Sequence, residues 1–313
     1  MVFCLGLISF FLALQAAPTA ATDHSLGDIP PSSLVYVSDY FSFVGQDGQG
    51  RVAFALDNNR GRDGDAYQAE HFLVLHDEKN GWAKLNGNSR YDNTGKELKT
   101  IPDSPFFQFQ GTPQTGMTIV GESNRLMLTI EPISLRTSRR HDGAVIWMGS
   151  APAVLTWRGR TIPGRVIYEY LMMPDFNRLT RTYWDILDEY QGFYLKMGME
   201  GDIYLHSQRS EHLAPLSGFL SGFTAVNSTS EFMKDLKVEV LDRRLARGFY
   251  RWPIAWRVTW AGRQGSAVLT LKQVSRTSIW NWAIGGFSMV VVEGELDYAG
   301  KKQPVYGLAK LLI

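Results

Sequence analysis

Three side chains that can exchange protons recur at every second position between Asp202 and His206. Asp202, Tyr204 and His206 alternate with Ile203 and Leu205. This period of two places the three polar groups on one face of a β-strand. A carboxylate, a phenol and an imidazole held together in a dry site could perform general acid–base catalysis. The alternative is that they form the solvent-facing half of an amphipathic strand.

A second pair of candidate acids or bases lies on a predicted strand over residues 69–76. Glu70 and His71 are adjacent there, so their side chains point to opposite faces of the strand. The same rule separates His71 from His76, and a regular strand cannot bring both to one metal ion. Either Glu70 or His71 could be desolvated inside a barrel and act as an acid or base. The alternative is one hydrogen-bonded core histidine and one exposed histidine.

Aromatic side chains would complete a site that protonates an alkene. Protonation produces a carbocation, which the π-faces of aromatic rings stabilise. Trp147, Trp256 and Trp282 are the candidates for lining such a cavity. Packing in the core is the commoner use of tryptophan and is the alternative for each of them.

Other kinds of chemistry lack their motifs in this chain. The one cysteine, Cys4, lies in an apolar N-terminal segment, which excludes thiolate catalysis and cysteine-bound zinc in a processed chain. HExxH, P-loop, dinucleotide-binding and G-x-S-x-G motifs are all absent. The net charge is +1 and there is no long basic run, which argues against a nucleic-acid partner. We therefore expect no metal, no cofactor and no nucleic acid.

A polar run from Asp57 to Asp65 follows the predicted strand 51–56. It contains three aspartates, but it lacks the spacing of a calcium-binding EF-hand loop and includes two arginines. We expect it to be a solvated loop between the strands 51–56 and 69–76, with an ion-pair network or anion site as the alternative.

Three similar segments indicate β-hairpins and an internal duplication. Each has an apolar residue, a polar residue, an aromatic residue, any residue, glycine and a base. They are Leu155–Arg160, Val258–Arg263 and Leu296–Lys301. Glycine allows the positive φ of a tight turn, and an apolar-rich stretch follows each segment. The third segment closes the chain and the first would close a similar unit near residue 172, which predicts two related β-domains. The alternative is that this pattern is ordinary hairpin chemistry.

The chain divides into five parts on this interpretation. Its 313 residues are enough for two domains, and short strands separated by turns predict a sandwich or barrel. Apolar residues at helical spacing predict a connecting helix over 177–191. The expected parts are a signal peptide (1–21), a linker (22–33), an N-terminal β-domain (34–173), a connecting helix (174–191) and a C-terminal β-domain (192–313).

The apolar stretch 1–15, followed by small residues, has the pattern of a signal peptide. Cleavage is expected between Ala17 and Ala21, which would leave a periplasmic or secreted protein with no integral membrane span. A retained membrane anchor is the alternative.

These features together resemble the hydroxyneurosporene synthase family, which comprises carotenoid 1,2-hydratase and AttH-like proteins. The resemblance lies in the exported tandem β architecture, a Gly-rich strand opening the N-terminal unit and the closing hairpin Glu293–Gly300. It covers residues 34–313 at the level of architecture. It implies an all-β, mainly antiparallel fold of two lipocalin-like barrels packed side by side, with a cavity for a large apolar ligand. No catalytic residue is carried over from the family.

Three functions are consistent with the sequence. The first is an exported protein that binds an apolar small molecule such as a lipid or isoprenoid. The second is an enzyme of the hydratase or cyclase type that acts on such a molecule by acid–base catalysis. The third is a glycan-binding β-domain protein with exposed tryptophans.

Overall fold

The fold is described by a computed structural model. It covers residues 34–92, 98, 106–121, 125–141, 144–175, 189–198, 201–209, 220–226, 229–245, 251–281 and 286–312. Over these ranges the chain forms antiparallel β-strands and no helix, which confirms the all-β prediction. It follows that no helix in these ranges could span a membrane. The predicted signal peptide (1–21) and linker (22–33) lie outside the described residues.

The N-terminal sheet contains the first ten strands. They are β1 (Leu34–Asp47), β2 (Gly50–Asp63), β3 (Ala66–Asp77), β4 (Gly81–Asp92), β5 (Phe107–Thr112), β6 (Gly116–Gly121), β7 (Leu126–Ile130), β8 (Ser134–His141), β9 (Ala144–Trp157) and β10 (Arg160–Pro174). Their order is β4-β3-β2-β1-β10-β9-β7-β6-β5, and β8 also pairs with β9. The last strand, β10, therefore lies between β1 and β9.

The C-terminal sheet contains the remaining nine strands. They are β11 (Glu189–Met197), β12 (Gly201–Arg209), β13 (Leu220–Val226), β14 (Thr229–Phe232), β15 (Lys234–Leu245), β16 (Arg251–Gly262), β17 (Gly265–Asn281), β18 (Gly286–Tyr298) and β19 (Lys301–Leu312). Their order is β14-β13-β12-β11-β19-β18-β17-β16-β15. Here too the last strand lies between the first and the penultimate one, as a duplicated unit predicts.

The three repeated segments all form hairpins, but they do not share one turn. Arg158 and Gly159 join β9 to β10, and Ala299 and Gly300 join β18 to β19, each pair with positive φ at both positions. These two-residue turns match the twist of the flanking strands. In the second copy the paired residues are Gly262 and Gly265, so the turn lies two positions later in the pattern.

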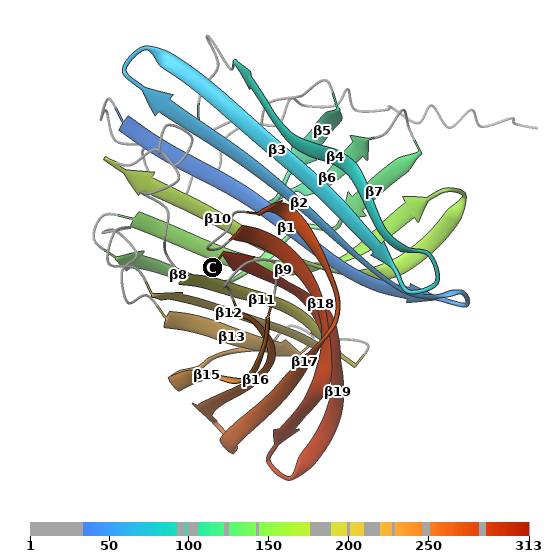
Figure 1. Ribbon diagram of the computed structural model, residues 1–313, viewed down its shortest axis with the longest axis vertical. Helices are drawn as coiled ribbons and strands as arrows, with labels where there is room; N and C mark the ends of the chain where they lie inside the picture. Colours follow the sequence, from blue (N-terminus) through green and yellow to red (C-terminus); the bar gives the residue numbers. More distant parts are fainter. Residues whose placement is uncertain are drawn as a thin grey trace, which may run out of the picture.

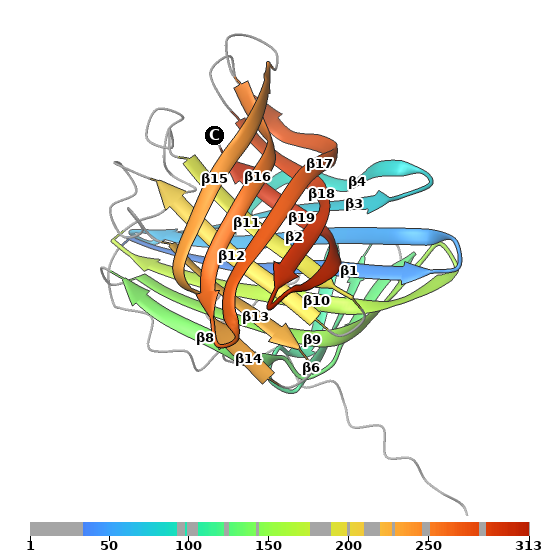
Figure 2. The same ribbon diagram turned by 90° about the horizontal axis from the view of Figure 1, so that it is seen from below.

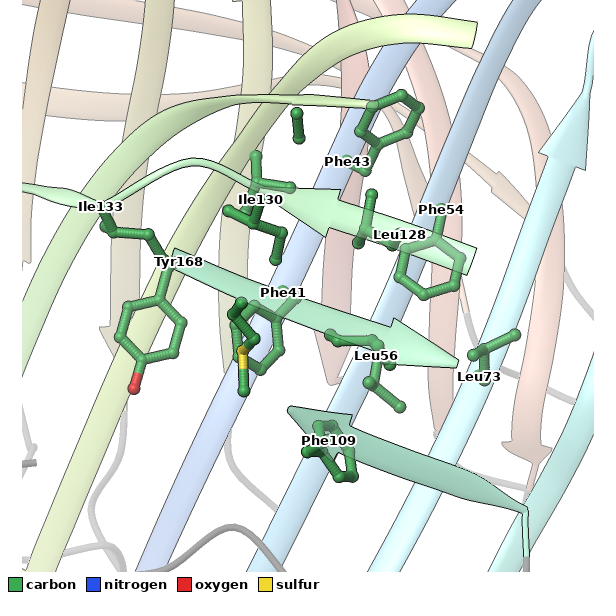
Figure 3. Packing of buried hydrophobic residues seen from close by; sticks show 14 of the residues in the cluster. Phe41, Phe43, Phe54, Leu56, Leu73, Phe109, Leu128, Ile130, Ile133 and Tyr168 are labelled. Carbon is green, nitrogen blue, oxygen red and sulfur yellow. The ribbon is translucent and has the colours of Figure 1, made fainter. Parts of the chain in front are cut away.

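Each sheet curls around its own apolar core (Figure 1). The interior of the N-terminal sheet is lined by aromatic and aliphatic side chains from nearly every strand. Figure 3 shows Phe109 of β5 and Leu128 of β7 facing Phe41, Phe54 and Leu56 of β1 and β2. The C-terminal sheet encloses a separate core that includes Trp252, Trp256 and Trp260. These two curled sheets are consistent with two tandem barrel domains.

The outer faces of the two sheets pack against each other and form a third buried layer. We call this layer the sheet interface. It joins Tyr40, Ile167 and Phe72 of the N-terminal sheet to Tyr194 and Leu308 of the C-terminal sheet. Figure 2 shows the red strand β19 crossing the blue strands β1 and β2, and β19 contacts both of them. Strands such as β1 and β10 are therefore buried on both faces.

Two local predictions need correction or lie partly outside the described residues. Residues 57–63 are not a loop, because β2 continues through them and Asp57 to Arg60 are buried. A strand buried on both faces hides polar side chains on either side, so their polarity did not indicate solvent. Of the predicted helix 177–191, residues 177–188 lie outside the described residues, and Glu189–Gln191 begin strand β11.

We predict that Gly307→Ala destabilises the fold, because β19 approaches β11 closely at this position. A Cβ atom at residue 307 would lie 2.2 Å from the carbonyl oxygen of Tyr194 and 2.8 Å from Cα of Leu195. Relieving this overlap should lower the free energy of unfolding by about 1–3 kcal/mol in urea titrations. Gly48→Ala is the matched control, since a Cβ atom there meets nothing within 4 Å. Equal stability of the two variants would contradict the close approach.

We predict that His71 contributes to acid sensitivity. Burial, aided by the nearby Arg60 guanidinium, lowers the pKa of His71 from 6.5 to about 3. Between pH 6.5 and pH 3 the His71 side chain is therefore protonated in the unfolded chain but not in the folded chain. Stability present above pH 6.5 is lost as the pH falls toward 3. At pH 5 this loss is about 2 kcal/mol. The stability difference between His71→Leu and wild type should shift in favour of the variant by that amount between pH 7 and pH 5; a constant difference would refute it.

Candidate functional site

A polar network lies at the centre of the sheet interface. Strand β12 directs Asp202, Tyr204 and His206 to this face, as the alternation predicts, and all three are at most 1 % exposed. The face is thus not wet, because the outer face of the N-terminal sheet covers it. The residue it meets there is Glu169 of β10, which is 3 % exposed.

Glu169 is the hub of the network. The hydroxyl of Tyr204 donates a short hydrogen bond to Oε2 of Glu169, and the hydroxyl of Tyr194 donates another at 3.1 Å. Nδ1 of His206 lies 3.5 Å from the same oxygen and 3.2 Å from the hydroxyl of Tyr204. The hydroxyl of Tyr190 lies 3.0 Å from that of Tyr194 and extends the chain of hydrogen bonds. One carboxylate oxygen is therefore shared by two phenols and an imidazole.

The surroundings shift the pKa values of the carboxyl group and of the phenols in opposite directions. Burial alone would raise the pKa of Glu169, but His206, Lys310 and Tyr204 together hold it below its ordinary value. Burial, and then the charge of Glu169, raises the pKa values of Tyr190, Tyr194 and Tyr204 well above 10. The site therefore holds an ionised carboxylate beside protonated phenols, which is an arrangement suited to proton transfer.

A second charged pair lies beside this hub. Nζ of Lys310 on β19 is 2.5 Å from Oδ2 of Asp57 on β2, and both side chains are buried. The hydroxyl of Ser38 donates to Oδ1 of the same aspartate at 2.9 Å. The Lys310 ammonium also lies 4.5 Å from the centre of the Tyr40 ring and 5.7 Å from that of Tyr190.

Aromatic rings surround the charged groups. Tyr40 and Tyr194 have ring centres 4.5 Å apart, and Tyr194 and Tyr204 5.2 Å apart. The His206 ring meets Tyr190 edge to face at 4.7 Å. Together with Phe223, which stacks on Tyr204, these rings present several π-faces to one small region. Such faces can stabilise a developing positive charge.

Asp202 is separated in role from its two strand neighbours. Both of its carboxylate oxygens accept hydrogen bonds from Arg165 of β10, each at 2.7 Å. This bidentate pair occupies the oxygens that a general acid or base would use. Asp202 therefore links the two sheets, while Tyr204 and His206 contact Glu169.

The other predicted acid–base residues lie away from this network. His71 is buried inside the N-terminal sheet, 6.1 Å from the ring of Phe107. Glu70, the preceding residue, is only partly buried, and the two neighbours are not brought together with Asp202, Tyr204 and His206. His76 faces the other side of β3, against Trp82, so the predicted separation of His71 from His76 is observed.

The interior of the N-terminal sheet holds its own compensated ion pair. The guanidinium of Arg60 lies 2.7 Å from Oδ2 of Asp39, and both side chains are fully buried. Tyr168 donates a short hydrogen bond to Asp39, and Trp147 packs edge to face on Tyr168 at 5.1 Å. Trp147 therefore lies in this core, a position that fits both its predicted use as a cavity residue and its use in core packing.

Of the two remaining cavity candidates, the structure describes Trp256 only. Trp256 is fully buried in the C-terminal core, where its indole nitrogen donates to Oε1 of Gln191 at 2.9 Å. Trp282 lies outside the described residues. Trp147, Trp157, Trp252, Trp256 and Trp260 are all less than 5 % exposed. These five tryptophans cannot serve as exposed platforms for sugars.

Sequence reasoning missed the hub and its neighbouring charge pair. Glu169 is the lone carboxylate in the apolar stretch Val166–Met173, and an isolated charge in a strand of that kind is the signal that could have identified it. Lys310 stands in the same way within the apolar end of the chain. The polar run that begins at Asp57 predicts a loop, and this hides Asp57 as a member of the buried pair. Within the described ranges, no cluster of three or more histidine, cysteine or acidic side chains could bind a metal ion.

Comparisons with known proteins give structural neighbours and no sequence relatives. No protein-family model matches the chain, and no curated protein matches it by sequence. Its fold is similar to that of an AttH-like protein from Nitrosomonas europaea, with a TM-score of 0.58, 11 % identity, and coverage of 95 % of this chain and 98 % of that one.

Two further structures show the same fold. Kievitone hydratase from Nectria haematococca has a TM-score of 0.59 at 9 % identity, with 88 % of each chain covered. CghA in complex with Sch210972 has a TM-score of 0.55 at 11 % identity, with 95 % of this chain and 94 % of that one covered. At these identities the likeness shows the fold alone: this chain has the lipocalin-like architecture of AttH-like proteins.

Proposed function

We propose that this protein is an acid–base enzyme of the hydratase or cyclase type that acts on a largely apolar, unsaturated substrate. The observation that carries the proposal is the shared oxygen of Glu169, which contacts Tyr204 and His206 within a shell of aromatic rings. One structural neighbour is a hydratase by name, which supports this choice over simple ligand binding.

The proposed chemistry assigns one role to each group. His206, as imidazolium, donates a proton to one alkene carbon, and the resulting cation faces the rings of Tyr40 and Tyr194. In a hydratase, water then forms a bond to the second carbon and loses a proton to the Glu169–His206 pair, so that one water is added in total. In a cyclase, a second double bond attacks the cation instead and the proton returns to the same pair. Tyr204 positions the carboxylate through its hydrogen bond.

Binding without turnover is the second candidate function. The sheet interiors and the sheet interface are lined by apolar and aromatic side chains, as sites for apolar ligands are. The buried tryptophans favour both of these functions over glycan binding. We also propose, from residues 1–21 alone, that the protein is exported.

We predict that Glu169→Gln and His206→Asn each lower turnover by about 10²–10⁴-fold, the range expected for loss of a general acid or base. The assay incubates the full-length protein with a panel of acyclic isoprenoids and polyunsaturated acids in deuterated water. Mass spectrometry then detects either a product heavier by one water or an isomer that carries carbon-bound deuterium.

Tyr298→Phe is the matched control for these variants. Tyr298 also donates a hydrogen bond to a glutamate, Glu231, at 3.0 Å, but on the same sheet away from the sheet interface. Its loss should leave turnover unchanged. Circular dichroism would establish that every variant is folded. Full activity in folded Glu169→Gln and His206→Asn variants would overturn the proposal, and stoichiometric ligand with no product from any substrate would favour binding.

A further inference from the structure

A pocket of about 290 Å³ lies at one end of the sheet interface. We call it the seam pocket. Its lining comes mainly from four strands and includes Val44 and Gln46 at the end of β1, Arg51 at the start of β2, Lys196 of β11, and Val305 and Tyr306 of β19. It is close to the lower limit of the range for small-molecule sites, about 300–1,000 Å³. Its wall is apolar apart from a few polar groups, as in ligand-binding sites generally.

Lys196 brings a positive charge to this pocket without an ion-pair partner among the described residues. Its nearest register partner on β12 is Asp202, whose two oxygens are both taken by Arg165. Burial, and then the charge of Arg165, lowers the pKa of Lys196, while Asp202 opposes this only in part. A half-buried ammonium beside a guanidinium is therefore under-compensated in the protein itself.

Tyr306 forms part of the pocket wall. It is 7 % exposed, and its hydroxyl has no hydrogen-bond partner within the part of the chain that the structure describes. Because the hydroxyl itself is buried, a ligand in the pocket meets the rest of the side chain. Arg51 stacks over the ring of Tyr306, 4.1 Å from its centre, which holds the side chain in place.

The charge balance around the pocket limits the ligand to a single negative charge. Arg51 is occupied by Glu78 at 2.6 Å and lies 3.4 Å from Glu293. Arg165 is occupied by Asp202. Of these three cations, Lys196 alone is left to neutralise a ligand. The apolar wall from Val44 and Val305 requires a hydrocarbon body next to the charged group.

We infer that the seam pocket binds a monocarboxylate with an aliphatic chain, with the carboxylate at Lys196 and the chain against Val44 and Val305. The pocket is distinct from the Glu169 network: Lys196 lies two residues, or about 7 Å, along β11 from Tyr194. The inference does not depend on the proposed function.

Octanoate is the probe that tests this site, and octanamide is its uncharged match. Isothermal titration of the full-length protein should show saturable binding of octanoate and at least tenfold weaker binding of octanamide. Lys196→Gln should weaken octanoate binding by about tenfold or more. Inorganic phosphate should not compete, because the pocket offers one uncompensated cation.

Lys302→Gln is the matched control, since Lys302 is an exposed lysine of the same strand as Tyr306 and pairs with Glu295. It should bind octanoate as wild type does. Thermal melts would establish that each variant is folded. Equal affinity for octanoate and octanamide, unchanged affinity in folded Lys196→Gln, or no saturable binding to the wild type would each overturn the inference. Glu169→Gln should bind octanoate normally, so failure of the acid–base proposal and failure of this one can be told apart.

Discussion

The structure depends on a face that is polar yet buried between two sheets. Among the described residues, three buried contacts between ionisable groups cross it, and each takes one partner from each sheet: Arg165 with Asp202, Lys310 with Asp57, and Glu169 with His206. An unpaired buried charge costs several kcal/mol. A shift of one sheet by one strand position would separate the partners of all three pairs, so the pairs fix the relative position of the sheets. Apolar packing holds the layers together, and these pairs set where they meet.

The same contacts that align the sheets also build the candidate site. Glu169 can be ionised in this environment only because His206, Lys310 and Tyr204 compensate its burial. The hydrogen bonds from Tyr194 and Tyr204 fix its orientation. Stability and proton transfer therefore draw on the same side chains, and a change at one of them alters both. This is why the candidate acid–base groups must be tested by variants that retain shape and remain folded.

Strand periodicity predicted which residues share a face, but not what that face meets. The common face of Asp202, Tyr204 and His206 follows from alternation alone, and the hairpins follow from glycine and its flanking residues. The identity of the covering sheet does not follow from alternation, because its residues, such as Glu169, are more than thirty positions away in the sequence. In β2 the polar residues divide between two buried faces, with Asp57 at the sheet interface and Arg60 in the interior. In a sheet with one face in solvent, a run of polar residues indicates a loop. In β2, which is buried on both faces, the same run forms a strand.

Placing the polar groups between the sheets leaves both cores intact. Each curled sheet keeps an interior that is largely apolar, and the ion pair of Asp39 with Arg60 in the N-terminal core is compensated locally. The face between the sheets exists only once two such units pack together, so it can carry a glutamate, a histidine and a lysine without weakening either core. A tandem arrangement thereby provides a buried, aromatic-lined surface on which chemistry can vary while the two folds remain constant.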